Sequence, residues 1–185
     1  MDKQFSTTSR MAFCGLAIAI NIVLGIVTAA LKFPFYLDVM GTMLIAVFFG
    51  PWYGAVVGAA TNVLTSIFSG SFSGMPFALV SIAVAFVVGF AFKKIKFNFL
   101  IGVLTGIVAP LIGTPIGIAV YGGLTGTISD VAVMFLKQSG ASIFAASFLP
   151  KLFNNLLDKV GSMLLVYLLV TALPKNMKPA SFSKK

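Results

Sequence analysis

Long apolar stretches alternate with short polar or basic connections along the chain. An α-helix needs about 20 apolar residues to cross a hydrocarbon core about 30 Å thick, and most of these stretches approach that length. The pattern therefore predicts six membrane-spanning helices in one bundle. Their expected bounds are 10–31, 39–49, 52–68, 76–92, 99–121 and 147–174. The second is short for a full crossing, and Pro110, Gly113 and Pro115 are expected to interrupt the fifth. The prolines either free backbone carbonyls that line a cavity or form kinks that packing tolerates.

A shorter amphipathic segment, 129–140, separates the fifth and sixth spans. Ser129 is a favourable helix N-cap, and Gly140 is a favourable stop. We predict a short helix on the extracellular side. It either covers the mouth of a pocket or rests in the membrane interface.

Composition supports a membrane location. Hydrophobic residues make up 59% of the chain and charged residues only 9%, which leaves too little polar surface for a soluble domain. Residues 39–92 and 97–129 contain no charged side chain. We therefore predict an all-α integral membrane protein, with residues 1–185 as a single transmembrane domain and a short basic tail at 175–185.

The net charge of +9 changes the picture only at the segment ends. Six crossings from a cytoplasmic N-terminus place most basic residues on the cytoplasmic side, as the positive-inside rule requires. Cytoplasmic N- and C-termini and attraction to anionic lipid at that face follow. Nucleic-acid binding is not expected. The basic residues assigned to this side are Lys3, Arg10, Lys93, Lys94, Lys96, Lys175, Lys178, Lys184 and Lys185.

A polar stripe crosses the last apolar stretch. Lys151, Asn154, Asn155 and Asp158 recur at i, i+3, i+4 and i+7, which is one face of a helix, and Lys159 follows them. A charge inside a membrane helix costs about 2.5–3.5 kcal/mol on insertion scales, so such residues usually face a cavity or a partner. The stripe predicts a binding pocket.

The position of the stripe predicts where that pocket opens. Asp158 lies fifteen residues before Leu173, or about 22 Å along the helix, which places it in the outer half of the membrane. We favour ligand binding by Asn154 and Asp158, and a structural role for Lys151 and Lys159. The alternative is structural: Asp158 pairs with Lys159 or a neighbouring helix, and Lys151 extends to the lipid headgroups.

Four further polar positions are candidates for the same pocket. Asn62 is the strongly polar residue of the third span, on a face with Gly54 and Gly58 that suits close helix packing. Tyr36 and Asp38, in the first extracellular connection, and Tyr121, at the outer end of the fifth span, suit a planar ring with a polar group. The alternative for Tyr36 and Tyr121 is an aromatic belt at the interface.

Several kinds of chemistry have no support. The chain has no His and a single cysteine, Cys14, so a metal site built on these ligands is not expected. Its four acidic residues are scattered, and it has neither a phosphate-binding glycine loop nor a nucleophile elbow. We expect no enzyme activity, no ATP hydrolysis and no cofactor.

Three motifs carry a resemblance. They are Gly50-Pro-Trp-Tyr-Gly-Ala-Val-Val-Gly-Ala-Ala-Thr-Asn62, Asn155-Leu-Leu-Asp-Lys-Val-Gly161 and Leu173-Pro174. Together with the length, the six-span layout and the basic C-terminus, they resemble the substrate-binding S components of energy-coupling factor (ECF) transporters. The resemblance implies a bacterial plasma-membrane protein that binds a vitamin or related micronutrient in an outward-facing pocket and topples to release it.

The resemblance also implies partners. A membrane T component and two ATPase subunits would supply the energy, and the first helix of such proteins contacts the T component through an Ala-x-x-x-Ala pattern. This chain departs from that pattern. Its nearest match is Gly15-x-x-x-Ala19, with Ala12 one turn earlier.

Substrate chemistry stays open at this point. The carboxylates of Asp38 and Asp158 suit a cationic nitrogen, and the tyrosines suit a ring, so a B6-type vitamer or a thiamine-like compound is a first expectation. An inward-pointing Lys151 favours a carboxylate or phosphate instead. Two other functions compete with vitamin binding: a self-sufficient carrier or channel, and a membrane-embedded sensor or assembly protein without a ligand.

Overall fold

The computed structural model describes residues 5–33, 35–95, 97–127, 129–174, 177–179 and 182. Every regular element in these residues is helical, as predicted. The predicted bounds agree with the observed ones to within four residues. The elements are α1 (Thr7–Ala30), α2 (Met40–Phe49), α3 (Pro51–Ser69), the 3-10 helix η1 (Phe72–Phe77), α4 (Ala78–Lys94), α5 (Asn98–Tyr121), α6 (Asp130–Gln138) and α7 (Ile143–Ala172).

Local sequence explains where several helices begin and end. The Ser6 hydroxyl accepts a hydrogen bond from the Ser9 N–H at the start of α1. Gly50, with a φ of 96°, separates α2 from α3, and Pro51 then occupies the first turn of α3. Gly70 ends α3 and Gly122 ends α5, both in the left-handed conformation that glycine adopts without strain.

Membrane-spanning length is clear for only part of the bundle. In the described residues, four segments are long and apolar enough to cross a membrane: Thr7–Ala30, Phe72–Lys94, Asn98–Tyr121 and Ile143–Ala172. α2, with 10 residues, is a shorter apolar helix. The count of six spans and the cytoplasmic orientation of the termini therefore stay predictions. Much of the expected tail, 175–185, lies outside the described residues.

The expected interruption of the fifth span is wrong. α5 runs as one helix through both Pro110 and Pro115. Membrane helices tolerate proline because neighbouring helices and local adjustments satisfy the freed backbone groups. Both Pro110 and Gly113 are buried, so close neighbours surround this part of α5.

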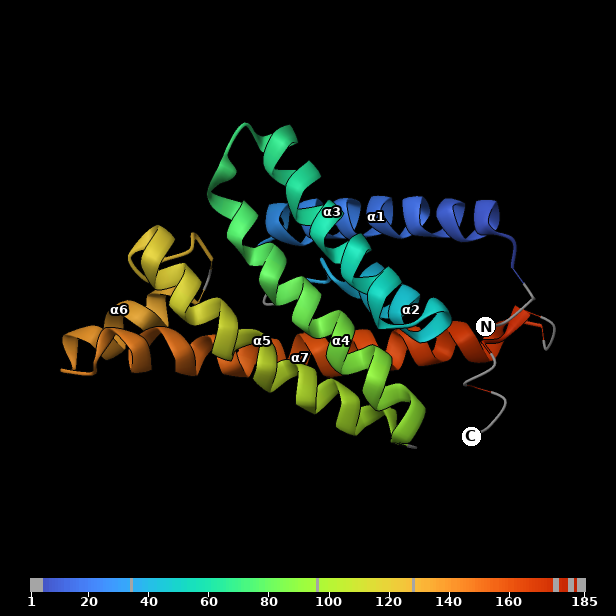
Figure 1. The fold of residues 1–185 in the computed structure, drawn as a ribbon. Coiled ribbons are helices and arrows are strands. Elements are labelled where there is room, and N and C mark those ends of the chain that lie inside the picture. Colours follow the sequence, from blue (N-terminus) through green and yellow to red (C-terminus); the bar gives the residue numbers. More distant parts are fainter. Residues whose placement is uncertain are drawn as a thin grey trace.

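The helices form an elongated bundle in which α1 and α7 run along its length (Figure 1). The start of α1 and the end of α7 lie at the same end, and α6 packs beside the start of α7 at the other. α3 and α4 pack together and cross obliquely between them (Figure 1). The chain direction therefore places Arg10, Lys93 and Lys94 near one end, and η1 and α6 near the other.

Glycines bring the helices close together. A Cβ on Gly102 would lie 2.7 Å from the Val160 Cα, and one on Gly106 would lie 2.9 Å from the Leu156 Cα, so α5 and α7 meet backbone to backbone. Gly54 and Gly58 of α3 meet α2 and α4 just as closely, as the packing interpretation of these glycines predicts.

An apolar core fills the end of the bundle that carries Lys93 and Lys94. It draws on α2, α4, the first turns of α5 and the second half of α7. Its fully buried members include Met43, Val84, Val88, Ile101, Met163, Val166 and Val170. The first half of α7 and the last turns of α5 contribute no residue to this core.

Candidate ligand-binding site

Two adjoining cavities open in the part of the bundle away from this core. The larger has a volume of about 760 Å³, and the smaller has a volume of about 250 Å³. Four residues line both cavities and therefore mark the boundary between them: Tyr36, Asp38, Asn62 and Thr127. The volume of the larger cavity is typical of small-molecule sites, and the smaller cavity lies just below their usual range.

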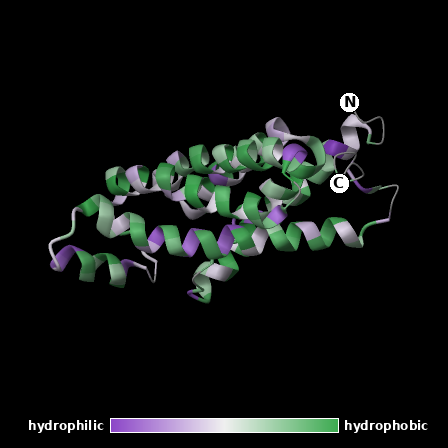
Figure 2. Ribbon diagram, turned by 90° about the horizontal axis from the view of Figure 1, so that it is seen from below, coloured by the Kyte–Doolittle hydropathy of each residue, from purple (hydrophilic) through white to green (hydrophobic). Residues whose placement is uncertain are grey.

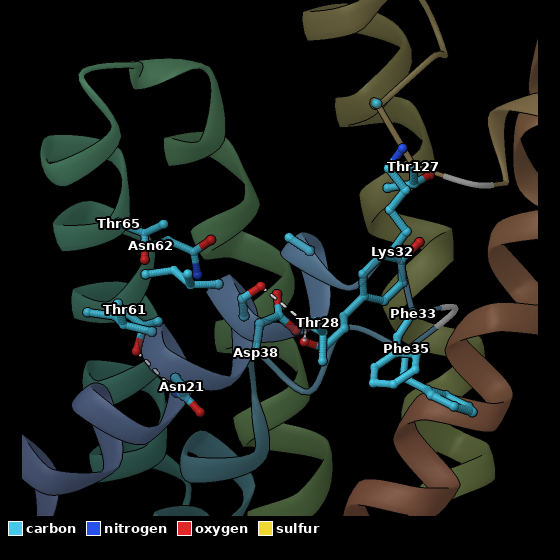
Figure 3. Close-up of a pocket in the computed structure, with 16 residues that line it drawn as sticks. Asn21, Thr28, Lys32, Phe33, Phe35, Asp38, Thr61, Asn62, Thr65 and Thr127 are labelled. Atoms are coloured by element: carbon cyan, nitrogen blue, oxygen red, sulfur yellow. Dashed lines mark hydrogen bonds between the residues drawn. The ribbon is translucent and has the colours of Figure 1, made fainter.

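The larger cavity lies between α1, the loop that joins α1 to α2, and α3. Figure 3 shows Thr61, Asn62 and Thr65 of α3 on one side, with Lys32, Phe33 and Phe35 of the loop on the other. Asp38 lies between the two groups (Figure 3). The loop side is therefore rich in aromatic rings, and the α3 side is rich in hydroxyl and amide groups.

The smaller cavity lies between η1, α4, α5 and α7. Its wall combines Phe77 and Tyr121, whose rings stack with centroids 6.1 Å apart, with the side chains of Lys151, Asn155 and Lys159. Figure 2 shows the hydrophilic turns in the middle of α7, between hydrophobic stretches. The polar stripe of the sequence thus reaches a cavity through part of its length.

Asp158 anchors the loop between α1 and α2. Its Oδ1 accepts hydrogen bonds from the backbone N–H groups of Tyr36, at 3.2 Å, and Leu37, at 2.9 Å. Its Oδ2 accepts a hydrogen bond from the Lys159 ammonium. The carboxylate is buried, with 1% of the residue exposed, and all these partners are internal. This is the structural alternative that the sequence offered for Asp158.

Lys159 is surrounded by opposite charge and an aromatic ring. Besides Asp158, its ammonium lies 3.8 Å from Asp38 Oδ1 and 5.9 Å from the centre of the Tyr36 ring. The Asp38 side chain remains 52% exposed toward the cavity. Desolvation at the rim raises the pKa of the Asp38 carboxyl, and Lys159 opposes that rise. Burial likewise raises the pKa of the Tyr36 phenol.

Lys151 contrasts with Lys159. The residue is 6% exposed, and its Nζ has no hydrogen-bond partner among the described residues. It lines the smaller cavity against Gly117, where a Cβ would lie 3.0 Å from Nζ. The expectation that Lys151 extends to the lipid headgroups is wrong, because the side chain is turned into the bundle.

Two asparagines, Asn62 half-buried and Asn21 fully buried, hold the cavity walls. Asn62 Nδ2 donates to the Gly58 carbonyl and to Ser81 Oγ, at 2.9 and 2.8 Å, and so links α3 to α4. Asn21 of α1 donates to Thr42 of α2 and Thr61 of α3. Its Oδ1 accepts from the Gly41 N–H at 2.7 Å. The walls are therefore joined by side-chain hydrogen bonds that link four helices, α1 to α4.

The predicted site residues divide into two groups. Tyr36, Asp38, Asn62, Tyr121 and Lys151 come together around the cavities, although they belong to different elements. The other two predicted ligands, Asn154 and Asp158, line neither cavity: Asp158 is occupied by the loop, and Asn154 lies beside the Tyr36 phenol. A ligand-binding role for these two residues stays a prediction, since neither lines a cavity in this conformation.

The predicted partner surface lies on the outside of the bundle. Ala12, Gly15 and Ala19 are all exposed on α1, and a Cβ on Gly15 would meet nothing within 4 Å. This face is open to another helix or to lipid. Contact with a T component stays a prediction.

Much of the larger cavity was not identified from the sequence. Its unpredicted polar lining comes from Asn21, Thr28, Lys32, Thr61 and Thr127. One signal was available: Asn21 and Thr28 are polar residues seven apart in an otherwise apolar span, and this spacing places them on one helix face. The aromatic pair, Phe33 and Phe35, gave no signal, because only the fold of the loop brings it to the edge of the cavity.

Comparison with known proteins identifies a family. The family model for the ECF-type riboflavin transporter, S component, matches residues 5–175. Comparison with curated proteins and with solved structures gives no match.

Proposed function

Because the chain belongs to the family of ECF-type riboflavin transporter S components, we propose that it binds a flavin-type vitamin for uptake into the cell. In this proposal it is a binding subunit with no catalytic activity of its own. A separate T component and two ATPase subunits energise release of the substrate. The chain occupies the plasma membrane of a bacterium, with the cavities open to the outside.

The observation that supports a flavin is the combination of the two cavity walls. A flavin has a flat, largely apolar ring system with carbonyl and N–H groups at one edge, and a chain of hydroxyl groups. Phe33, Phe35 and Tyr36 offer rings on one side of the larger cavity. Thr61, Asn62 and Thr65 offer hydrogen-bonding groups on the other. Flat apolar surface beside a few polar groups is typical of small-molecule sites.

The closed end of the bundle supports a binding subunit over a carrier or channel. Beyond the cavities, Met163, Val166 and Val170 of α7 are fully buried in the apolar core. A self-sufficient channel needs a polar path through this region, and the core residues offer none. Release on the inner side then requires a rearrangement driven by partner proteins.

A panel of vitamins tests the proposal. The full-length protein is purified in detergent, freed of bound ligand, and heated with riboflavin, pyridoxine, pyridoxal or thiamine. We expect riboflavin to give the largest rise in melting temperature, because only ligands that prefer the folded state stabilise it. Stabilisation by pyridoxine or thiamine instead would replace the flavin with the B6-type or thiamine-like expectation. No stabilisation, together with solute flux in vesicles that contain this chain alone, would overturn the binding-subunit proposal.

A pair of tyrosine variants locates the site. Tyr36 lines both cavities, whereas Tyr53 lies on the exposed side of α3 and lines neither. We expect Tyr36→Leu to weaken riboflavin binding about tenfold through loss of ring contact, while Tyr53→Leu retains the wild-type affinity. Equal affinities for the two variants would place the ligand elsewhere.

A further inference from the structure

The smaller cavity contains a charge without a counterion. Lys151 Nζ is buried and lines the cavity, and it has no hydrogen-bond partner in the part of the chain that the structure describes. A buried charge is strongly unfavourable unless something pairs with it. Every other buried charge in the described chain has an internal partner: Asp158 with Lys159, and Asp130 with backbone N–H groups.

None of the carboxylates in the described residues forms an ion pair with Lys151. Asp130 attracts it electrostatically but lies outside ion-pair distance. The Asp130 oxygens already accept from the N–H groups of Thr125, at 3.1 Å, and Gly126, at 2.7 Å. Asp38 and Asp158 face Lys159. The three acidic residues described in the structure therefore interact with groups other than Lys151.

The surroundings of Lys151 leave room for a ligand group. The absence of a side chain at Gly117 keeps space in front of the ammonium, since a Cβ there would come within 3.0 Å of Nζ. Thr125 and Thr127 place hydroxyl groups on the same cavity wall, and Asn155 adds an amide. Beside the paired Lys159 and Asp38, the described lining of the cavity therefore offers an ammonium without a partner, several hydrogen-bond donors and enough volume for a compact polar group.

We propose that Lys151 binds an anionic group of the ligand, a phosphate or a carboxylate, in the smaller cavity while the ligand's ring occupies the larger one. The inference rests on the proposed function for the identity of the ring. It adds that the preferred substrate class is the negatively charged form of the vitamin rather than the neutral one. Tyr36, Asp38, Asn62 and Thr127, which line both cavities, lie where such a ligand would pass from one cavity to the other.

Pairs of ligands that share a ring system and differ in an anionic group test the proposal. Titration calorimetry on the full-length protein compares riboflavin with riboflavin 5′-phosphate for phosphate, and lumiflavin with 10-carboxymethylflavin for carboxylate. We expect at least one anionic flavin to bind about tenfold or more tightly than its neutral counterpart, since charge-assisted hydrogen bonds are the stronger ones. Pyridoxal and pyridoxal 5′-phosphate form a second pair that does not depend on the flavin assignment.

Variants then assign the discrimination to one residue. Lys151→Met should reduce the affinity ratio between the anionic and neutral ligands to near one, and Lys151→Arg should keep a ratio above one. Gly117→Ala, which intrudes on the ammonium, should lower the ratio without removing a charge. Lys137→Met, on the exposed face of α6, is the matched control and should keep the wild-type ratio.

The outcomes separate the two proposals. Failure of all flavins with a clear preference for pyridoxal 5′-phosphate would remove the flavin assignment and keep the role of Lys151. Binding of riboflavin with no preference for either anionic flavin would keep the proposed function and overturn this inference. A ratio unchanged in Lys151→Met, or no anionic ligand that binds better than its neutral counterpart, would also overturn it.

Discussion

Two lysines on α7, eight residues apart, are both buried and have opposite surroundings. Lys159 contacts Asp158, approaches Asp38 and lies over the Tyr36 ring. Lys151 faces a cavity and has no polar partner among the described residues. The first belongs to a closed internal network that fixes the loop between α1 and α2. In our proposal, the Lys151 ammonium gains a partner only when an anionic ligand enters the cavity. Burial alone therefore does not distinguish a structural charge from a functional one; the partners do.

The largest expected effect comes from removing the carboxylate of the closed network. Asp158→Ala leaves the Lys159 ammonium buried and frees two backbone N–H groups of the loop. We expect a loss of about 3–5 kcal/mol in unfolding free energy, measured by denaturant titration in detergent. The double variant Asp158→Leu with Lys159→Leu should recover part of that loss. A double variant that is less stable than the single one would contradict the assignment of a paired network.

The close contact between α5 and α7 holds both lysines in place. Gly106→Val would force a side chain against the α7 backbone at Leu156, where even a Cβ lies 2.9 Å away. We expect a loss of about 1–3 kcal/mol from overpacking, seen as a lower melting temperature. Gly161→Val is the control, since a Cβ at Gly161 meets nothing within 4 Å. Similar losses for both variants would show that helix propensity, not the contact, decides the effect.

Removing the unpaired charge should have the opposite sign. Without ligand, Lys151→Met takes a desolvated ammonium out of the bundle, and we expect stability to rise by about 1–2 kcal/mol. Thermal unfolding of the ligand-free protein measures this. A fall in stability would mean that Lys151 has a structural partner, and the contrast with Lys159 would disappear.

The smallest effect is expected at an unpaired neutral group. Thr114 is fully buried, and its hydroxyl has no hydrogen-bond partner in the described part of the chain. Thr114→Val keeps the shape and removes the hydroxyl, so stability should change by less than about 1 kcal/mol. The same thermal measurement applies. A change as large as that of Lys151→Met would show that shape, rather than charge, sets both results.

The apolar stretches and the glycine and proline residues between them predicted the helices well. Gly50-Pro51 marked the boundary between α2 and α3, and the segment 129–140 contains α6. These features depend on neighbouring residues, so the sequence displays them directly. The prolines of α5 were misjudged because their effect depends on the helices packed around them.

The different roles of the residues in the polar stripe could not be predicted from the local sequence. Spacing placed Lys151 and Asp158 on one face of α7, and both are buried. Spacing does not show that the loop between α1 and α2 folds back onto Asp158, across more than a hundred residues of chain. That contact makes Asp158 an anchor of the loop, whereas Lys151 faces a cavity. The aromatic lining from Phe33 and Phe35 depends on the same loop.

The hydrogen bonds that the Tyr36 and Leu37 N–H groups donate to Asp158 also set an order for biosynthesis. The loop emerges from the ribosome long before α7, and domains acquire structure as their parts become available during translation. Its anchored form cannot be reached until the final helix has entered the bilayer. The larger cavity therefore takes its final form only after α7 has been made. A nascent chain released before α7 would contain the residues that line this cavity but would lack the Asp158 carboxylate that holds the loop in place.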